Sequence, residues 1–214
     1  MGELSEYMVH VDDDLIILDK PTGLLCVPGR GIDKQDCLAA RAQAIYPDAR
    51  IVHRLDMATS GLCLMARGAA MQRALSAQFA DRRVTKRYEA IVAGHPQAPL
   101  PGEWSLIDLP IAADWPNRPR QVIDLASGKP SQTRWRLIRR EDSGSRLELE
   151  PLTGRTHQLR VHLKALGHAI LGDALYGDRQ VQALSPRLML HAQGLAFTHP
   201  ASGAALHFTS PTPF

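Results

Sequence analysis

The amino-acid sequence predicts an α/β protein of the α+β type, with a mixed, mostly antiparallel central sheet, flanking helices and a cleft. Several segments alternate apolar and polar residues with the period of a strand, and a glycine-containing link joins two of them. Segments of helical periodicity stand between the strands without the regular alternation of a doubly wound parallel sheet. The 214 residues suffice for one domain, and we expect a single domain over residues 1–214 with two lobes across the cleft.

The N-terminal part of the chain is expected to form two strands with a helix between them. The apolar run Leu15–Leu18 is typical of a strand, which ends at the turn Pro21-x-Gly23. A helix is expected over residues 38–45, capped by Asp36 or a neighbouring residue. The apolar run from Gly61 to Ala66 has the length of a second, buried strand.

The central and C-terminal parts add two helices and several strands. Met71, Leu75 and Phe79 stand four residues apart, which predicts an amphipathic helix over residues 69–79 with this stripe in the core. The remaining predictions are a strand at 85–94, a surface loop at 95–102, a β-hairpin of 131–138 with 146–150, a helix at 156–166 and extended pieces at 188–190, 195–198 and 205–209.

Composition excludes several classes of protein. The 44% of hydrophobic and 22% of charged residues are ordinary for a globular protein, no run has the length of a membrane span, and the N-terminus lacks a signal-peptide pattern. Three cysteines without metal-ligand spacing fit a reducing compartment, so we expect the cytoplasm. The adjacent aspartates 12–14 would alternate between strand faces and cannot easily converge on one ion, so we expect no metal.

Basic residues form clusters, although the net charge of the chain is only +3. Such clusters suit contacts with nucleic-acid phosphates, and the alternative for each is a solvated charged surface. The clusters are Arg82, Arg83, Lys86 and Arg87; Arg118 and Arg120; and Arg134, Arg136, Arg139 and Arg140.

The segment 53–61 is the first candidate for chemistry. It places Arg54 and Asp56 on a predicted loop that a Thr-Ser-Gly turn closes before the buried strand. A carboxylate on a loop that a rigid scaffold holds is a common arrangement for catalysis. The alternative is structural: Asp56 caps a local turn and pairs with Arg54.

Other parts of the chain offer partners for that carboxylate. Arg155 and Arg160, at the start and second turn of the last predicted helix, could lower the pKa of Asp56 and fix its direction. Tyr88 has an aromatic face that can stack on a base and a hydroxyl that can move a proton, and its alternative is a strand aromatic in the core.

Five motifs occur together along the chain. One is the segment His53-Arg54-Leu55-Asp56-x-x-Thr59-Ser60-Gly61. The others are Asp19-Lys20-Pro21-x-Gly23, Lys86-Arg87-Tyr88, the run from Gly154 to His162, and Ile170-Leu171-Gly172-Asp173-x-x-Tyr176-Gly177. Together they resemble the motifs of the RluA family of pseudouridine synthases, in the same order and over nearly the whole chain, and the segment 53–61 looks like the family signature.

The resemblance implies isomerisation of uridine to pseudouridine within RNA, without a cofactor. It makes Asp56 the nucleophile that attacks the ribose or assists cleavage of the glycosidic bond. It also implies that Tyr88 stacks on the uracil and transfers a proton, that Arg160 orients Asp56 and that Arg54 fills the gap left by the flipped base. The detached uracil must then turn inside a closed apolar pocket, for which Leu190 or its neighbours are candidates.

The resemblance also bears on the RNA partners. Within the family it is strongest to a dual-specificity member that acts on 23S rRNA and on the anticodon stem-loop of certain tRNAs. Many relatives carry an N-terminal S4 domain, and we expect none here, nor an obligate protein partner, so the protein should act as a monomer. RNA contacts are expected from the Trp115–Arg118 loop and the basic clusters; the candidate RNA-binding residues are His53, Arg54, Lys86, Arg87, Arg118 and Arg155.

Two alternatives compete with this interpretation. A non-catalytic RNA-binding ribosome-assembly factor of the same fold would have lost Asp56 or Tyr88, and both are present. A metal-dependent nucleic-acid hydrolase would need converging ligands, which no spacing in the chain provides.

Overall fold

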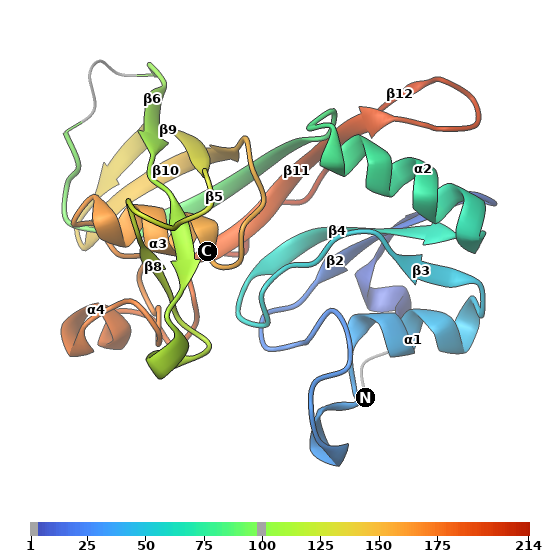
Figure 1. Ribbon diagram of the computed structural model, residues 1–214, viewed down its shortest axis with the longest axis horizontal. Coiled ribbons are helices and arrows are strands. Elements are labelled where there is room, and N and C mark those ends of the chain that lie inside the picture. The colour runs from blue at the N-terminus through green and yellow to red at the C-terminus, as the bar shows by residue number, and fades with distance from the viewer. Residues whose placement is uncertain (1–3, 98–101) are drawn as a thin grey trace. The chain divides into compact units, whose positions relative to one another are not determined.

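The computed structural model describes residues 4–97 and 102–214 (Figure 1). The chain divides into two compact units. It passes from the first unit to the second inside strand β5 (Thr85–Ala93) and returns inside strand β11 (Leu190–Thr198). Unit 1 comprises Met1–Lys86 and Ala192–Pro213, and unit 2 comprises Arg87–His191 and Phe214.

The sheet of unit 1 has the strand order β1-β2-β4-β11, with β3 paired to β4 and β12 paired to β11. The pairs β1–β2, β2–β4, β3–β4 and β11–β12 are antiparallel, as expected. The strands are β1 (Met8–Val11), β2 (Leu15–Lys20), β3 (Ala49–Ile51), β4 (Ser60–Arg67) and β12 (Ala205–Thr209).

Helices cover both faces of this sheet because its central strands are apolar on both faces. The side chains of Leu15 to Leu18 in β2 are all fully buried, which requires cover on each side. Figure 1 shows α1 (Leu38–Ile45) and α2 (Gly68–Ala80) on opposite sides of β2 and β4. Met71 and Leu75 of α2 join the same core cluster as Leu15, which confirms the predicted apolar stripe.

Unit 2 is built on a second run of antiparallel strands in the order β5-β10-β9-β6. The predicted β-hairpin is confirmed as β9 (Gln132–Glu141) and β10 (Gly144–Pro151). Strands β7 (Ile111–Ala113) and β8 (Gln121–Ile123) form a separate antiparallel hairpin, the β7–β8 hairpin. The remaining elements are β6 (Ser105–Asp108), α3 (Gln158–Ala165) and α4 (Arg179–Ala183).

The structure corrects one helix boundary and identifies one helix cap. Helix α3 begins at Gln158 rather than at residue 156, because His157 has a left-handed backbone with a φ of 54° and serves as the N-cap. The cap of α1 is the neighbour of Asp36: the sulfur of Cys37 accepts the N–H of Ala40. The predicted surface loop at 95–102 falls partly outside the described residues.

Within the described chain, no helix is long and apolar enough to cross a membrane. The acidic triplet at residues 12–14 serves a local turn, since the carboxylate of Asp12 accepts the backbone N–H groups of Asp14 and Leu15. Across residues 4–97 and 102–214, no three His, Cys, Asp or Glu side chains gather as a metal site would require.

Candidate active site

Asp56 lies in unit 1, on the loop between β3 and β4, as predicted. Its side chain is half-buried, whereas that of Arg54 is exposed and that of Leu55 is buried between them. The carbonyl oxygen of Asp56 accepts the N–H of Thr59 at 3.1 Å, which closes a turn immediately before β4. Alternating exposure along 54–56 thus anchors the loop through Leu55 and leaves both charged side chains solvent-accessible.

The segment 20–23 holds the loop on one side of Asp56. Lys20 is 0% exposed, and its ammonium donates to the carbonyl oxygen of Met57 at 3.0 Å and to those of Pro21 and Leu24 at 2.8 Å. The hydroxyl of Thr22 donates to the carbonyl of Ala58 at 2.7 Å, and the N–H of Gly23 donates to that of Met57 at 2.8 Å. A buried ammonium with several carbonyl acceptors restrains backbone direction strongly.

Two buried thiols hold the loop on the other side. The sulfur of Cys26 accepts the N–H of Leu55 at 3.2 Å, and the thiol of Cys63 donates to the carbonyl of His53 at 3.9 Å. The hydrogen bond between the thiols lowers the pKa of Cys26 to about 7, against the opposing effect of burial, and raises the pKa of Cys63 above its usual value. Both backbone neighbours of Arg54 are therefore fixed from within unit 1.

His53 is held inside unit 1 as well. Its Nε2 accepts the N–H of Leu64 at 3.0 Å, and its ring stacks on Phe79 with the ring centroids 4.6 Å apart. Burial, with a contribution from the charge of Lys86, lowers the pKa of His53 to about 3. The imidazole is consequently neutral at physiological pH and offers no positive charge to a phosphate.

Arg160 lies in unit 2, in the first turn of α3, and is held by Asp173. Its Nε and Nη2 donate to the two oxygens of Asp173 at 2.8 and 2.7 Å, and the two side chains are 5% and 0% exposed. The same carboxylate accepts the N–H groups of Leu175 and Tyr176. This two-point geometry fixes the plane and direction of the guanidinium.

Arg155 stands on the loop before α3, and the loop is shaped by Gln158. The buried amide oxygen of Gln158 accepts the N–H of Arg155 at 2.9 Å and the hydroxyl of Thr153 at 2.7 Å. The amide nitrogen of Gln158 donates to the carbonyl of Gln132 at 2.9 Å. The backbone of the loop is thereby fixed, and the Arg155 side chain is exposed.

Tyr88, Lys86 and Arg87 are consecutive on β5 and half-buried. Tyr88 pairs across the sheet with Leu149 of β10. Arg87 donates to Glu150 at 2.8 Å and stacks over the ring of Trp104 at 4.8 Å, so its guanidinium is committed within unit 2.

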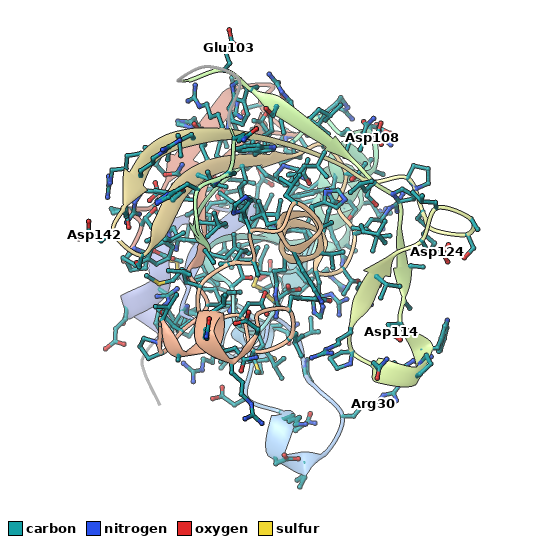
Figure 2. All side chains as sticks on the ribbon, turned by 90° about the vertical axis from the view of Figure 1, so that its left-hand side faces the viewer. Arg30, Glu103, Asp108, Asp114, Asp124 and Asp142 are labelled. Atoms are coloured by element: carbon teal, nitrogen blue, oxygen red, sulfur yellow. The ribbon has the colours of Figure 1, made fainter. Side chains whose placement is uncertain are left out.

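Arg118 belongs to the exposed end of the β7–β8 hairpin. Its guanidinium carbon lies 3.5 Å from the ring centroid of Trp115, which is 69% exposed. Figure 2 shows Asp114 beside this short 3-10 turn and Asp124 in the loop after β8. An exposed aromatic with a stacked guanidinium is suited to unpaired RNA bases.

Three members of the third arginine cluster, Arg134, Arg136 and Arg139, form ion pairs and do not make a free phosphate site. Arg134 donates to Glu150 at 3.1 Å and Arg136 to Glu148 at 2.6 Å. We call this surface the Arg–Glu ladder; its members are Arg87, Arg134, Arg136, Arg139 and Arg146 with Glu89, Glu141, Glu148 and Glu150. The cross-strand register of β9 and β10 places the opposite charges side by side.

The structure thus brings the candidate residues into two groups. His53, Arg54, Asp56 and Lys86 belong to unit 1, and Arg87, Tyr88, Arg118, Arg155 and Arg160 belong to unit 2. Sequence reasoning missed the roles of Lys20, Thr22 and Asp173, which hold the two groups in place. Lys20 and Asp173 belong to the motifs quoted above, which were the available signal, whereas Thr22 occupies an unspecified position of its motif. The motifs do not show which residue each of the three contacts.

Comparison with known proteins defines the class. The model of the RNA pseudouridylate synthase family matches residues 14–165, which include the Asp56 loop and Arg160. The chain belongs to this family. Its reaction is therefore the isomerisation of uridine in RNA, and the mostly antiparallel α/β fold predicted above is confirmed.

Individual relatives are similar over nearly their whole length. The chain is 47% identical to the dual-specificity RNA pseudouridine synthase RluA of Escherichia coli strain K12, with 97% of this chain and 93% of that protein covered. Identity to RluA of Yersinia pestis is 46%, covering 94% and 96%. Among solved structures, human RNA pseudouridylate synthase domain containing 1 matches with a TM-score of 0.77 and 32% identity, covering 97% of this chain and 83% of that chain.

Proposed function

We propose that this protein forms pseudouridine in two RNAs, 23S rRNA and the anticodon stem-loop of certain tRNAs. Relatives that are 46–47% identical over almost the whole chain bear the name dual-specificity synthase. The main support for catalysis by Asp56 is that its loop is restrained on both sides. Lys20 and Thr22 hold the residues after Asp56, and the thiols of Cys26 and Cys63 hold the residues before it.

In this proposal Asp56 is the nucleophile. Holding a reacting group in a fixed direction removes rotational freedom that would otherwise be lost in the transition state. The loop carbonyls on the C-terminal side of Asp56 are held at Met57 and Ala58, so the backbone that carries the carboxylate has little freedom. A carboxylate needs this restraint because it must meet one atom of a flipped nucleotide.

Arg160 and Tyr88 complete the proposed catalytic set. Arg160 orients Asp56 by a salt bridge during the reaction, and its two-point bond to Asp173 supports this role because the guanidinium plane cannot turn. Tyr88 stacks on the uracil and transfers a proton.

Arg54 is proposed to fill the space that the flipped uridine leaves in the RNA. Its exposed side chain stands on a restrained backbone, so the planar guanidinium can stack between bases while the loop stays in place. Unstacking a nucleotide costs a few kcal/mol, and a stacked replacement offsets part of that cost.

RNA contacts are divided between direct and indirect ones. Arg118, Arg155 and Lys86 are proposed to meet the RNA directly. His53 and Arg87 are proposed to act indirectly, because the first is neutral and the second is paired with Glu150. We further propose that residues 1–214 act as one catalytic domain, as a cytoplasmic monomer without cofactor or obligate protein partner.

The test uses purified protein with two synthetic RNAs, an anticodon stem-loop and a fragment of 23S rRNA, followed by mapping of pseudouridine. Wild type should modify one uridine in each, and Asp56→Asn should bind RNA yet form no product. The matched control is Asp13→Asn, the same chemical change at an exposed carboxylate of unit 1. Product from Asp56→Asn near the wild-type rate would remove Asp56 as nucleophile, and product on one RNA only would remove the dual specificity.

A further inference from the structure

Tyr176 lies where three segments of unit 2 meet. Its ring is buried with Ile111 and Val161 in a small core cluster, and Ile123 packs against that cluster. Ile111 and Ile123 belong to the β7–β8 hairpin, and Val161 belongs to α3. The hydroxyl of this tyrosine therefore stands between the hairpin proposed to contact RNA and the helix that carries Arg160.

On the hairpin side, the hydroxyl oxygen accepts the N–H of Gln121 at 2.8 Å. Gln121 is the first residue of β8 and follows the turn that carries Trp115 and Arg118. That turn is closed by the N–H of Asp114, which donates to the carbonyl of Arg120 at 3.0 Å. The hydroxyl thus holds the base of the exposed turn together with this backbone hydrogen bond.

On the helix side, the same hydroxyl lies 2.7 Å from Nδ1 of His157. His157 is the N-cap of α3, and its carbonyl accepts the N–H of Val161 as the first bond of the helix. Its φ of 54° is unfavourable for a residue other than glycine and persists only where the surroundings hold it. The hydroxyl–imidazole bond is one such restraint.

The ring of Tyr176 also faces the catalytic candidate. The guanidinium carbon of Arg160 lies 5.1 Å from the ring centroid. Asp173 accepts the N–H of Tyr176 at 3.1 Å while it holds Arg160 at two points. The positions of Tyr176 and Arg160 are therefore set by one carboxylate.

From these contacts we infer that Tyr176 and His157 form a positioning pair that couples RNA engagement at the β7–β8 hairpin to the orientation of Arg160. The inference rests on the proposed function. With the imidazole protonated on Nε2, the hydrogen bonds run from the N–H of Gln121 to the hydroxyl and from the hydroxyl to Nδ1, and such chains are cooperative. An RNA that seats correctly on the hairpin favours this chain, and a poorly fitting RNA weakens it together with the start of α3.

The test substitutes Tyr176→Phe, which keeps the ring in the core and near Arg160 but removes the hydroxyl bonds to Gln121 and His157. At saturating RNA, kcat should fall on the order of ten-fold, the scale of one or two lost hydrogen bonds. Trp115→Ala should reduce both kcat and affinity in the wild-type background, but only affinity in the Tyr176→Phe background. If Tyr176 had only a structural role, Tyr176→Phe would lower the melting temperature, and Trp115→Ala would change kcat and affinity to the same extent in both backgrounds.

The chain supplies a matched control and a conservative rescue. Tyr46→Phe makes the same change on a ring that also faces a guanidinium, that of Arg67 at 5.1 Å, and should leave both constants at their wild-type values. His157→Asn keeps a side-chain acceptor and tolerates the left-handed backbone, so it should retain more activity than His157→Ala. Additive effects of Tyr176→Phe and Trp115→Ala, or equal losses in the two His157 variants, would overturn the inference.

Amide hydrogen exchange tests, in the absence of RNA, whether Tyr176 links the β7–β8 hairpin to α3. In Tyr176→Phe, the amides of Gln121 and Val161 should both exchange faster than in the wild type, and unchanged exchange at Val161 would overturn the coupling. If wild type formed no pseudouridine in either RNA, the proposed function would fail, while this measurement would still decide whether the hairpin and α3 are linked.

Discussion

At the scale of single residues, Arg160 and Asp173 form a buried ion pair in unit 2. Two ions removed from water lose their hydration, and only close geometry and further hydrogen bonds offset that loss. Here two nitrogens of Arg160 donate to the two oxygens of Asp173 at 2.7 and 2.8 Å, and two backbone N–H groups also donate to this carboxylate. The pair therefore fixes direction more than it adds stability, and it is intolerant of the loss of one partner.

Asp173→Asn should lower the free energy of unfolding by about 3–5 kcal/mol, because the buried guanidinium of Arg160 would lose the carboxylate charge that binds it at two points. Chemical denaturation measures the change. The control is Asp81→Asn, whose partner Arg83 lies 3.2 Å away with both side chains more than half exposed, and it should change stability by less than about 1 kcal/mol. Equal effects of the two substitutions would contradict a strongly buried pair.

His53 makes stability depend on pH. Burial lowers its pKa from 6.5 to about 3, so between these values the unfolded chain binds a proton that the folded chain does not. The contribution to stability is complete above about pH 6.5 and is lost as the pH falls toward 3, by at most about 1.4 kcal/mol per pH unit.

His53→Gln retains an acceptor for the N–H of Leu64 but cannot titrate. Denaturation at a series of pH values should show a shallower loss of stability in the variant than in the wild type below pH 6.5, and parallel curves above it. All other titrating groups are common to both proteins, so the difference isolates His53. Parallel curves down to pH 4 would mean that the imidazole becomes protonated in the folded state.

At the scale of elements, the strands β9 and β10 illustrate how a basic sequence produces a neutralised surface. Arginines at alternate positions of β9 face glutamates at alternate positions of β10, because the antiparallel register pairs Arg134 with Glu150 and Arg136 with Glu148. Trp104 packs against the guanidinium groups of the same residues. The Arg–Glu ladder is consequently a poor source of net charge for RNA phosphates.

Arg134→Gln should leave RNA affinity and its salt dependence unchanged, because Glu150 already accepts this guanidinium and keeps Arg87 afterwards. Arg118→Gln is the comparison, since its guanidinium also stacks on a tryptophan but lies on the β7–β8 hairpin. Arg118→Gln should weaken binding and reduce the slope of log Kd against log salt by about 0.7–0.9, the effect of one phosphate contact. A reduced slope for Arg134→Gln would reassign the ladder to RNA binding.

At the scale of the whole molecule, unit 1 depends on segments far apart in the chain. Unit 1 combines the first 86 residues with a C-terminal segment, and Gly61 shows why the two must match. A Cβ at Gly61 would lie 2.4 to 2.8 Å from backbone atoms of Ala192, and its φ is 112°. The glycine of the signature motif is therefore required by a contact across about 130 residues of sequence.

Local patterns in the sequence were sufficient to predict most of the helices and strands. The apolar run of β2, the four-residue stripe of α2 and the alternation of β9 and β10 depend on near neighbours, because the periods of helices and strands are set by the backbone alone. The motifs were likewise sufficient for the family, and they named Asp56, Tyr88 and Arg160 as candidate residues whose catalytic roles stay predictions.

Only the tertiary structure decided what holds those residues and which charges are neutralised. Lys20 meets the carbonyl of Met57, Asp173 meets Arg160 across 13 positions, and the glutamates of β10 meet the arginines of β9 and β5. The physical reason is that a buried ion or a paired charge is defined by its partner and not by its own position in the sequence. A pattern shows which side chains are apolar or charged, and folding determines which of them meet.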